Sequence, residues 1–289
     1  MTIQITSHQI QTDISIFSGG EVHVQLNDQL NAGDLTHSKA IDIRADIRSS
    51  DDLMSLLLVH NALMNKKKEG EVLQVNVEIP YFPYARQDRV CAVGQAFSLQ
   101  VVAKLINDLD LHALTVWDAH SILTEELTGA NNISQAEILS SHQVLSDLLK
   151  SNNTVLICPD KGAIKKCQEV AQTFSISEIA YAEKIRDPKT GEISNTQLTS
   201  ENIKGKTAVI IDDICDGGRT FIEIAKILKK KQCDRVILYV THGIFSKGLE
   251  VFDGLIDEIF TTNSFPQKED NKLTIIDFSC NTNKRSAKI

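Results

Sequence analysis

The sequence predicts an α/β protein built of two Rossmann-like halves, each a mostly parallel sheet flanked by helices. Apolar segments of strand length alternate with segments that carry apolar residues at helical spacing, which is typical of βαβ units. A polar interval at residues 140–153 separates two such series, and a chain of 289 residues is long enough for two cores. We therefore predict domains at 1–146 and 147–289.

The first half is predicted to alternate strands with helices. Short apolar runs predict strands at 21–26, 40–43, 71–79 and 113–117. Apolar residues that recur every three or four positions predict helices at 52–67 and 98–107. Because the strands are expected to be parallel, the loops that follow Ile79 and Trp117 should lie at the same edge of the sheet.

The second half repeats this order, which predicts a similar fold. Strands are predicted at 154–158, 176–182, 208–211 and 236–241. A short helical pattern surrounds 144–149, a second helix runs from Ile164 towards Val170, and a third spans 221–230. In the third helix the apolar positions are Phe221, Ile224, Ala225 and Leu228.

Composition and charge exclude several classes of protein. A formal net charge of -8 argues against a nucleic-acid surface, so an anionic ligand would need locally placed arginines and lysines. The six cysteines form no C-x-x-C pair, which indicates reduced thiols, not a zinc cage or a disulfide framework. With no signal-like N-terminus and no apolar run of spanning length, we expect a cytoplasmic protein without a membrane partner.

The most specific pattern is the segment 209–220, where an apolar run leads through carboxylates and two glycines into a helix. The first amides of a helix lack partners inside it and its dipole is positive there, so this turn suits an anion. Gly217 and Gly218 allow the main chain to approach a phosphate closely. The turn, 216–220, is therefore predicted to bind phosphate.

The carboxylates beside this turn predict that the phosphate belongs to a sugar. Asp212 and Asp213, at the expected carboxyl end of the strand, are poor phosphate ligands but can accept hydrogen bonds from ribose hydroxyls or hold the water shell of Mg²⁺. The alternative is an acidic turn with a capping aspartate. The predicted site consists of Asp212, Asp213, Asp216, Gly217, Gly218, Arg219 and Thr220.

Two loops of the first half carry groups suited to a nucleotide. Arg86, Gln87 and Arg89 follow the strand that ends at Ile79; guanidinium groups bind phosphate oxygens in pairs, and glutamine can bind a purine or ribose. His120 follows the next strand and could hold magnesium or contact a triphosphate. The alternatives are a solvated loop with an Arg–Asp surface pair, and a structural histidine. His112 precedes its strand and is rejected because it lies at the wrong end of the sheet.

Two further loops belong to the second half. Asp160, Lys161 and Gly162 lie in a small-residue turn that could cradle a diphosphate, with Asp160 binding its metal. The segment 183–191 is basic, polar and interrupted by proline and glycine, a composition suited to a mobile loop that delivers cations to phosphates. A plain surface hairpin is the alternative for this second segment.

Together these motifs resemble the ribose-phosphate diphosphokinases, the phosphoribosyl pyrophosphate synthases, from residue 17 to about residue 278. The loop 84–89 resembles the family's ATP-binding loop, and Asp118-x-His120 its histidine motif. The segment 17–21 is similar to the one that reaches a neighbouring subunit's adenine site through Phe17 and Glu21. Lys184 and Arg186 resemble the catalytic pair of the flexible loop, and 212–220 the ribose 5-phosphate site, which Arg186 also contacts.

The resemblance implies two phosphoribosyltransferase-type domains and transfer of the diphosphoryl group of ATP to ribose 5-phosphate, giving phosphoribosyl diphosphate and AMP. It also implies Mg²⁺ held by His120 and Asp160, and a homo-oligomer, either a dimer or a hexamer built from dimers. No P-loop motif occurs, so ATP would be bound by the Arg86 loop. Gly217 and Arg219 replace the threonine and glycine of the family's usual loop. The alternatives are a non-catalytic regulatory subunit and a phosphoribosyltransferase.

Overall fold

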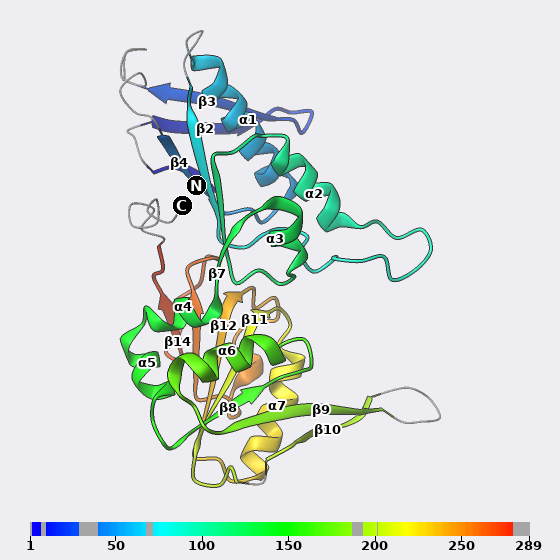
Figure 1. Cartoon of the computed structure of the whole chain (residues 1–289), viewed down its shortest axis with the longest axis vertical. Helices are drawn as coiled ribbons and strands as arrows, with labels where there is room; N and C mark the ends of the chain where they lie inside the picture. The colour runs from blue at the N-terminus through cyan, green and yellow to red at the C-terminus, as the bar shows by residue number, and fades with distance from the viewer. Residues whose placement is uncertain are drawn as a thin grey trace. The chain divides into compact units, whose positions relative to one another are not determined.

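The computed structural model describes residues 2–6, 10–28, 40–67, 72–186, 193–200 and 202–279. The chain divides into two compact units, Met1–Ile133 and Ser134–Ile289 (Figure 1). The division comes before the predicted boundary near residue 146, because helices α4 (Gln135–Ser140) and α5 (Gln143–Leu149) pack against α6 (Ile164–Phe174) and β8 (Thr154–Cys158) of the second unit. Each unit is described separately below.

The first unit is built around a five-stranded sheet in the order β1-β4-β5-β6-β7. Its strands are β1 (Ile3–Ile5), β4 (Ala40–Ala45), β5 (Gln74–Ile79), β6 (Ala113–Trp117) and β7 (Asn131–Ile133). All neighbours are parallel except β1, which runs antiparallel to β4 at the edge. The helices are α1 (Ser50–Lys66), α2 (Ser98–Asn107) and α3 (Leu123–Thr128).

A separate two-stranded sheet in the first unit pairs β2 (Ile10–Ile16) with β3 (Val22–Asp28) in antiparallel register. The strand predicted at 21–26 therefore exists, but it belongs to a hairpin and not to the parallel sheet. Leu26 and Ile10 are buried in the core of this unit, which explains the apolar signal at 21–26.

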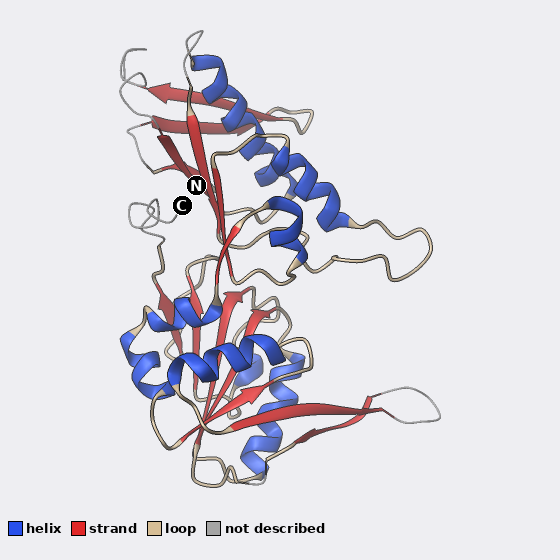
Figure 2. Cartoon of the chain, in the orientation of Figure 1, coloured by secondary structure: helices blue, strands red, loops and turns tan. Residues whose placement is uncertain are grey.

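The second unit contains a seven-stranded sheet in the order β10-β9-β8-β11-β12-β13-β14 (Figure 2). Its remaining strands are β9 (Ile179–Arg186), β10 (Ile193–Leu198), β11 (Thr207–Cys215), β12 (Arg235–Gly243), β13 (Glu258–Thr262) and β14 (Leu273–Ile276). Every pair is parallel except β9 and β10, which form a hairpin. Helix α7 (Arg219–Lys230) and the short 3₁₀ helix η2 (Glu250–Phe252) complete the unit.

The central strands of this sheet are buried along their length, as expected for parallel strands with both faces covered. Ile210 of β11 and Leu238 of β12 lie in one apolar cluster with Ile224 and Leu228 of α7. The α/β class with mostly parallel sheets, predicted for both halves, is confirmed.

Strand β11 corrects the predicted position of the paired carboxylates. The strand continues to Cys215, so Asp212 and Asp213 lie within it, not after its end. The reason is long-range, because pairing with β12 extends as far as Cys215 opposite Gly243. Helix α7 begins at Arg219 instead of Phe221, which shortens the predicted turn to 216–218.

Candidate active site

The turn between β11 and α7 places main-chain amides at a helix N-terminus, as the sequence predicts for a phosphate site. Gly218 occupies the N-cap position with φ +74°, a left-handed conformation that favours glycine. A Cβ on Gly218 would lie 2.5 Å from Cζ of Phe252, a buried residue of η2. Packing against Phe252 and backbone conformation therefore both require glycine here.

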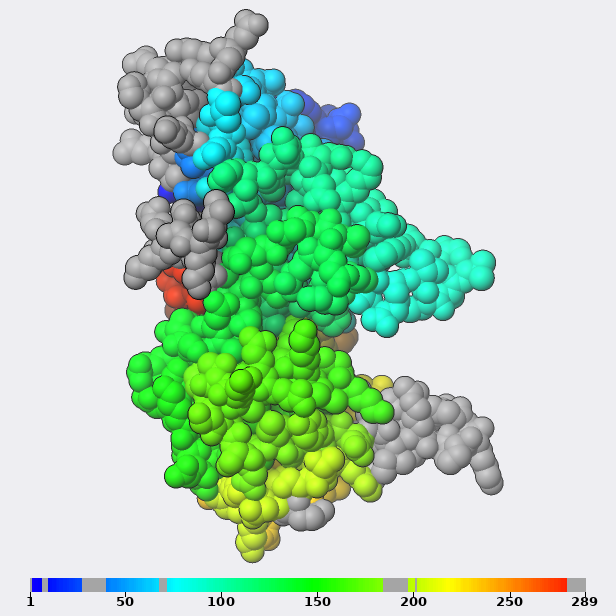
Figure 3. Space-filling model, viewed as in Figure 1, coloured from blue at the N-terminus to red at the C-terminus, as the bar shows by residue number. Residues whose placement is uncertain are grey.

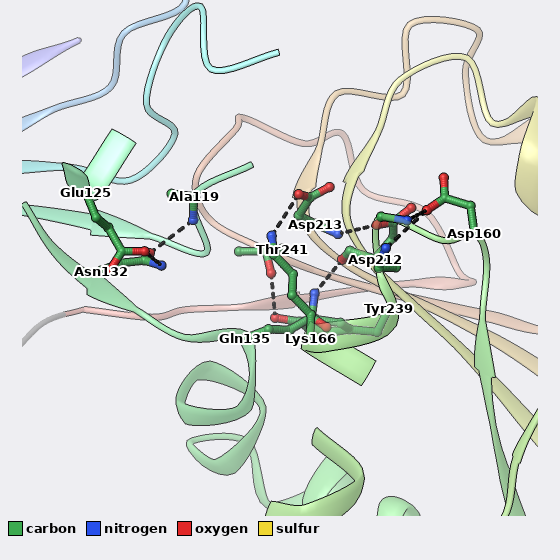
Figure 4. A network of polar contacts seen from close by, with 12 residues as sticks. Ala119, Glu125, Asn132, Gln135, Asp160, Lys166, Asp212, Asp213, Tyr239 and Thr241 are labelled. Carbon is green, nitrogen blue, oxygen red and sulfur yellow. Dashed lines mark hydrogen bonds and ion pairs between the residues drawn. The ribbon is translucent and has the colours of Figure 1, made fainter. Parts of the chain in front are cut away.

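Asp212 and Asp213 have different surroundings, because neighbouring residues of a strand point to opposite faces. Asp213 is buried, and its Oδ2 lies 2.8 Å from Nζ of Lys166 on α6. Asp212 is half-buried; its Oδ1 accepts a hydrogen bond of 2.9 Å from the amide of Asp213, and its main-chain oxygen accepts one of 2.7 Å from Nε2 of Gln135 (Figure 4). The ion pair occupies the Asp213 carboxylate, so contact between Asp213 and a sugar stays a prediction.

The Asp212 carboxyl group is held in an environment that disfavours its charge. Burial raises its pKa well above the ordinary value, and the carboxylates of Asp213 and Asp160 raise it further. A carboxyl group with such a shift beside a helix N-terminus is typical of a functional site. The role of Asp212 in binding the sugar stays a prediction.

Replacing Asp212 by asparagine is expected to raise the melting temperature at pH 8, because the folded chain then no longer holds this carboxylate charge. The pKa of Asp212 is raised in the folded state. Its charged carboxylate therefore destabilises the folded chain at pH values above the ordinary pKa of about 3.8, and this effect grows as the pH rises. Thermal unfolding at several pH values tests this, with exposed Asp234 replaced by asparagine as the control. A rise in melting temperature that does not depend on pH, or a lower melting temperature at pH 8, would contradict the raised pKa of Asp212.

The turn after β8 is held by Asp160. Its Oδ1 accepts hydrogen bonds from the amides of Gly162, at 2.8 Å, and Ala163, at 3.1 Å, immediately before α6. These amides are among those predicted to cradle a diphosphate, and here they bind a side chain of the protein. Lys161 is exposed at the same turn. The roles of Asp160, Lys161 and Gly162 in binding diphosphate or metal stay predictions.

Arg219, in the first turn of α7, faces solvent. Its side chain is 91% exposed, and its Nε lies 3.0 Å from Oε1 of Glu223, one turn along the helix. This arrangement directs the guanidinium group along the helix surface and pairs it with a carboxylate. The predicted contact of Arg219 with phosphate would require this exposed pair to separate, which costs little.

In the first unit, the structure brings together two loops predicted to bind ATP. Asp88 accepts a hydrogen bond of 2.8 Å from Nε of Arg89, and this contact is the main reason why the pKa of Asp88 is lowered. A hydrogen bond from Ser121 and the charge of His120 lower it further. The loops after β5 and β6 therefore meet at one edge, with Arg89 and His120 both exposed there.

The other predicted ATP ligands lie on the same loop. Arg86 and Gln87 are exposed, and Oε1 of Gln87 accepts a hydrogen bond from Oγ of Ser98 at the start of α2. Residues 89–96 are exposed throughout and project from this unit (Figure 3). The Arg–Asp surface pair, considered as an alternative from sequence, is present between Arg89 and Asp88.

The backbone of the His120 loop is fixed by neighbouring polar groups. Asp118 has φ +41° and is buried, and its amide donates to the main-chain oxygen of Ile133 at 2.8 Å. The amide of Ala119 donates to Oδ1 of Asn132, whose Nδ2 donates in turn to Glu125, both at 3.0 Å (Figure 4). These contacts fix the backbone from which the His120 side chain extends.

Phe17 and Glu21 lie at the β2–β3 hairpin, as the first and last residues of its turn. The amide of Phe17 donates to the main-chain oxygen of Glu21 at 2.9 Å. Phe17 is 55% exposed and its ring centroid lies 5.2 Å from that of His23. An exposed aromatic residue at a hairpin tip is compatible with the predicted contact to a neighbouring subunit, which stays a prediction.

Lys184 and Arg186 lie on β9, where Lys184 pairs with Thr196 and Arg186 with Ile193 of β10. The side chains of both residues, and the segment 187–192, lie outside the described part of the chain. The described backbone has the form of the hairpin that the sequence left open as an alternative. The catalytic role of both residues stays a prediction.

Sequence reasoning missed two residues that shape this site, Lys166 and Gln135. Lys166 stabilises the charge of Asp213, and Gln135 holds the backbone at Asp212. Lys166 falls in the helix predicted from Ile164 towards Val170, but neither residue belongs to a motif that indicates its partner. Within the described residues, no helix is long and apolar enough to cross a membrane, and no three His, Cys, Asp or Glu side chains form a metal-binding group.

Comparison with known proteins first defines the class. Residues 125–280 match the model of the phosphoribosyl transferase domain, and residues 2–109 match the N-terminal domain of ribose phosphate pyrophosphokinase. The fold agrees with a crystal structure of phosphoribosylpyrophosphate synthetase from Mycobacterium smegmatis, with a TM-score of 0.75, 19% identity, and coverage of 92% of this chain and 85% of that one.

Curated relatives then define the family. The ribose-phosphate pyrophosphokinase of Pyrococcus furiosus is 32% identical over 260 residues, which cover 88% of this chain and 86% of the relative. That of Pyrococcus abyssi is 31% identical over 277 residues, covering 93% of this chain and 89% of the relative. The chain belongs to the ribose-phosphate pyrophosphokinase family and is an enzyme.

Proposed function

We propose that the chain transfers the β,γ-diphosphoryl group of ATP to the C1 hydroxyl of ribose 5-phosphate, releasing AMP and phosphoribosyl diphosphate. The observation that carries this proposal is that one chain matches both the N-terminal domain of ribose phosphate pyrophosphokinase and the phosphoribosyl transferase domain. In the reaction, the C1 oxygen bonds to the β-phosphorus, the bridge to the α-phosphate breaks, and AMP leaves with the bonding electrons while the hydroxyl proton is released.

The second unit supplies the sugar-phosphate site in this proposal. The amides of the turn 216–218 and of the first residues of α7 bind the 5-phosphate, where the positive end of the helix dipole favours it. Asp212 and Asp216 accept hydrogen bonds from the sugar hydroxyls. These contacts fix the position of the C1 hydroxyl. Positioning of the reactants accounts for much of the rate acceleration by enzymes that transfer phosphoryl groups.

The first unit supplies the nucleotide site in this proposal. Arg86 and Arg89 bind phosphate oxygens, Gln87 binds the nucleoside, and His120 lies at the same edge of the sheet.

Two residues of β9, in the second unit, act on the transition state in this proposal. Lys184 and Arg186 stabilise the negative charge that develops as the bond to AMP lengthens.

Mg²⁺ fits this site only as an ion brought in by ATP. The described residues contain no group of three metal-binding side chains, whereas Mg²⁺ is commonly held by one or two carboxylates together with substrate phosphates and water. We propose Asp160 and His120 as its protein ligands. When bound, the ion neutralises charge on the phosphate oxygens.

We propose that the active form is a homo-oligomer in the cytoplasm, where ATP is available. Phe17 is exposed at a hairpin tip, and an aromatic side chain in that position suits contact with a second copy. Light scattering of the purified chain tests the assembly. A mass equal to one chain in an active preparation would contradict it.

The reaction is tested by mixing the purified chain with ATP, ribose 5-phosphate and Mg²⁺ and measuring AMP. We expect AMP to form in equal amount to phosphoribosyl diphosphate, and only when ribose 5-phosphate is present. A regulatory subunit would form no AMP, and a phosphoribosyltransferase would consume phosphoribosyl diphosphate in the presence of a nucleobase. Either of those outcomes would overturn the proposal.

A further inference from the structure

Among the described residues, two cations of the proposed sugar-phosphate site are paired with carboxylates. Asp212 and Asp213 lie near the end of β11 and Asp216 lies in the turn itself, so a phosphate dianion bound there would be near carboxylates. The ammonium group of Lys166 is paired with Asp213 at 2.8 Å, and Arg219 is paired with Glu223 at 3.0 Å. The helix N-terminus alone contributes about half an elementary charge, which is less than the phosphate carries.

Lys247 lies beside this turn on the loop after β12. A Cβ placed on Gly217 would lie 3.6 Å from Cγ of Lys247, so the lysine stem packs against the glycine. The two loops are also joined by a hydrogen bond of 3.1 Å from the amide of Ser246 to the main-chain oxygen of Asp216. The stem of Lys247 is thereby held at the turn, while Lys247 as a whole is exposed to solvent.

The charge of Lys247 is available for a ligand. Among the described residues, it has no hydrogen-bond or ion-pair partner, unlike Lys166 and Arg219. The following segment is fixed in place, because Phe252 packs on Gly218 and the ring of Phe245 lies 6.4 Å from that of Phe252. A flexible lysine on a fixed loop can place its ammonium group over a phosphate bound at the turn.

We infer that Lys247 binds the 5-phosphate of the sugar substrate and sets the affinity for it, an inference that rests on the proposed function. The ammonium group supplies the cation that offsets the carboxylates of Asp212 and Asp216. Lys247 acts on binding of the phosphate and not on the transfer of the diphosphoryl group.

Lys247→Ala tests this in the AMP assay. We expect the KM for ribose 5-phosphate to rise about tenfold, while kcat and the KM for ATP change less than about twofold. Lys247→Arg keeps the positive charge and should restore most of the affinity. Lys226→Ala, at an exposed position of α7, is the matched control and should leave all three constants unchanged.

A second measurement separates this inference from the proposed reaction. Inorganic phosphate should bind the unmodified chain, as measured by calorimetry, and Lys247→Ala should weaken that binding about tenfold. An unchanged KM for ribose 5-phosphate together with unchanged phosphate binding would overturn the inference. Absence of AMP formation by the unmodified chain would instead overturn the proposed function, and the phosphate measurement would still decide the role of Lys247.

Discussion

Replacing Lys184 by alanine is expected to lower turnover about 100- to 1,000-fold while ATP binding stays close to that of the unmodified chain. The ammonium group is proposed to meet negative charge that grows only in the transition state, so its loss should change kcat far more than affinity. The backbone of Lys184 pairs with Thr196 of β10, so the substitution should leave the hairpin intact. Turnover in the AMP assay and calorimetric binding of ATP measure the two quantities.

The matched control for Lys184 is Gln197→Ala on the opposite strand of the same hairpin. Gln197 is exposed and pairs with Glu183, the neighbour of Lys184, so its substitution perturbs the same hairpin without removing a cation. It should leave turnover unchanged. Full activity of Lys184→Ala, or an equal loss of ATP binding and turnover, would contradict a role confined to the transition state.

Replacing Gly218 by alanine is expected to lower the free energy of unfolding of the second unit by about 2–4 kcal/mol. Two effects add: the residue has φ +74°, and its new Cβ would lie 2.5 Å from Cζ of Phe252. Displacement of the turn would also move the amides proposed to hold the 5-phosphate. We therefore expect the KM for ribose 5-phosphate to rise at least tenfold, with little change in ATP binding.

Gly217→Ala is the control, because the two glycines are adjacent but differ in their surroundings. A Cβ on Gly217 would make only ordinary contact, 3.6 Å from Cγ of Lys247, and its φ is not left-handed. Thermal unfolding should therefore separate the variants, with Gly217→Ala within about 0.5 kcal/mol of the unmodified chain. Equal destabilisation by both would show that the turn does not depend on the packing against Phe252.

Local patterns predicted much of the fold. The helix at 98–107 and the strands at 113–117 and 154–158 agree with the structure, because each is a self-contained run of apolar residues at one spacing. Short strands such as β1 and β7 were missed, since three residues give no measurable periodicity. Pairing with a neighbouring strand, which sequence spacing does not encode, defines them.

The limits of sequence reasoning at the site have the same physical origin. The phosphate turn was predicted because Gly217, Gly218 and the following helix are consecutive in sequence. The partners of Asp212 and Asp213 were not, because Gln135, which donates to the main-chain oxygen of Asp212, and Lys166, which pairs with the Asp213 carboxylate, come from helices far away along the chain. Likewise Lys247 belongs to no sequence motif, and contacts formed only in the folded chain, such as the packing of its stem on Gly217, relate it to the site.

The central claim is that the whole diphosphoryl group moves, and the position of an isotopic label tests it most directly. With ATP labelled at the β-phosphorus and ribose 5-phosphate present, the account predicts that the label appears in phosphoribosyl diphosphate, while the released nucleotide is unlabelled AMP. Label retained in ADP would mean transfer of the terminal phosphate alone, and would contradict the account.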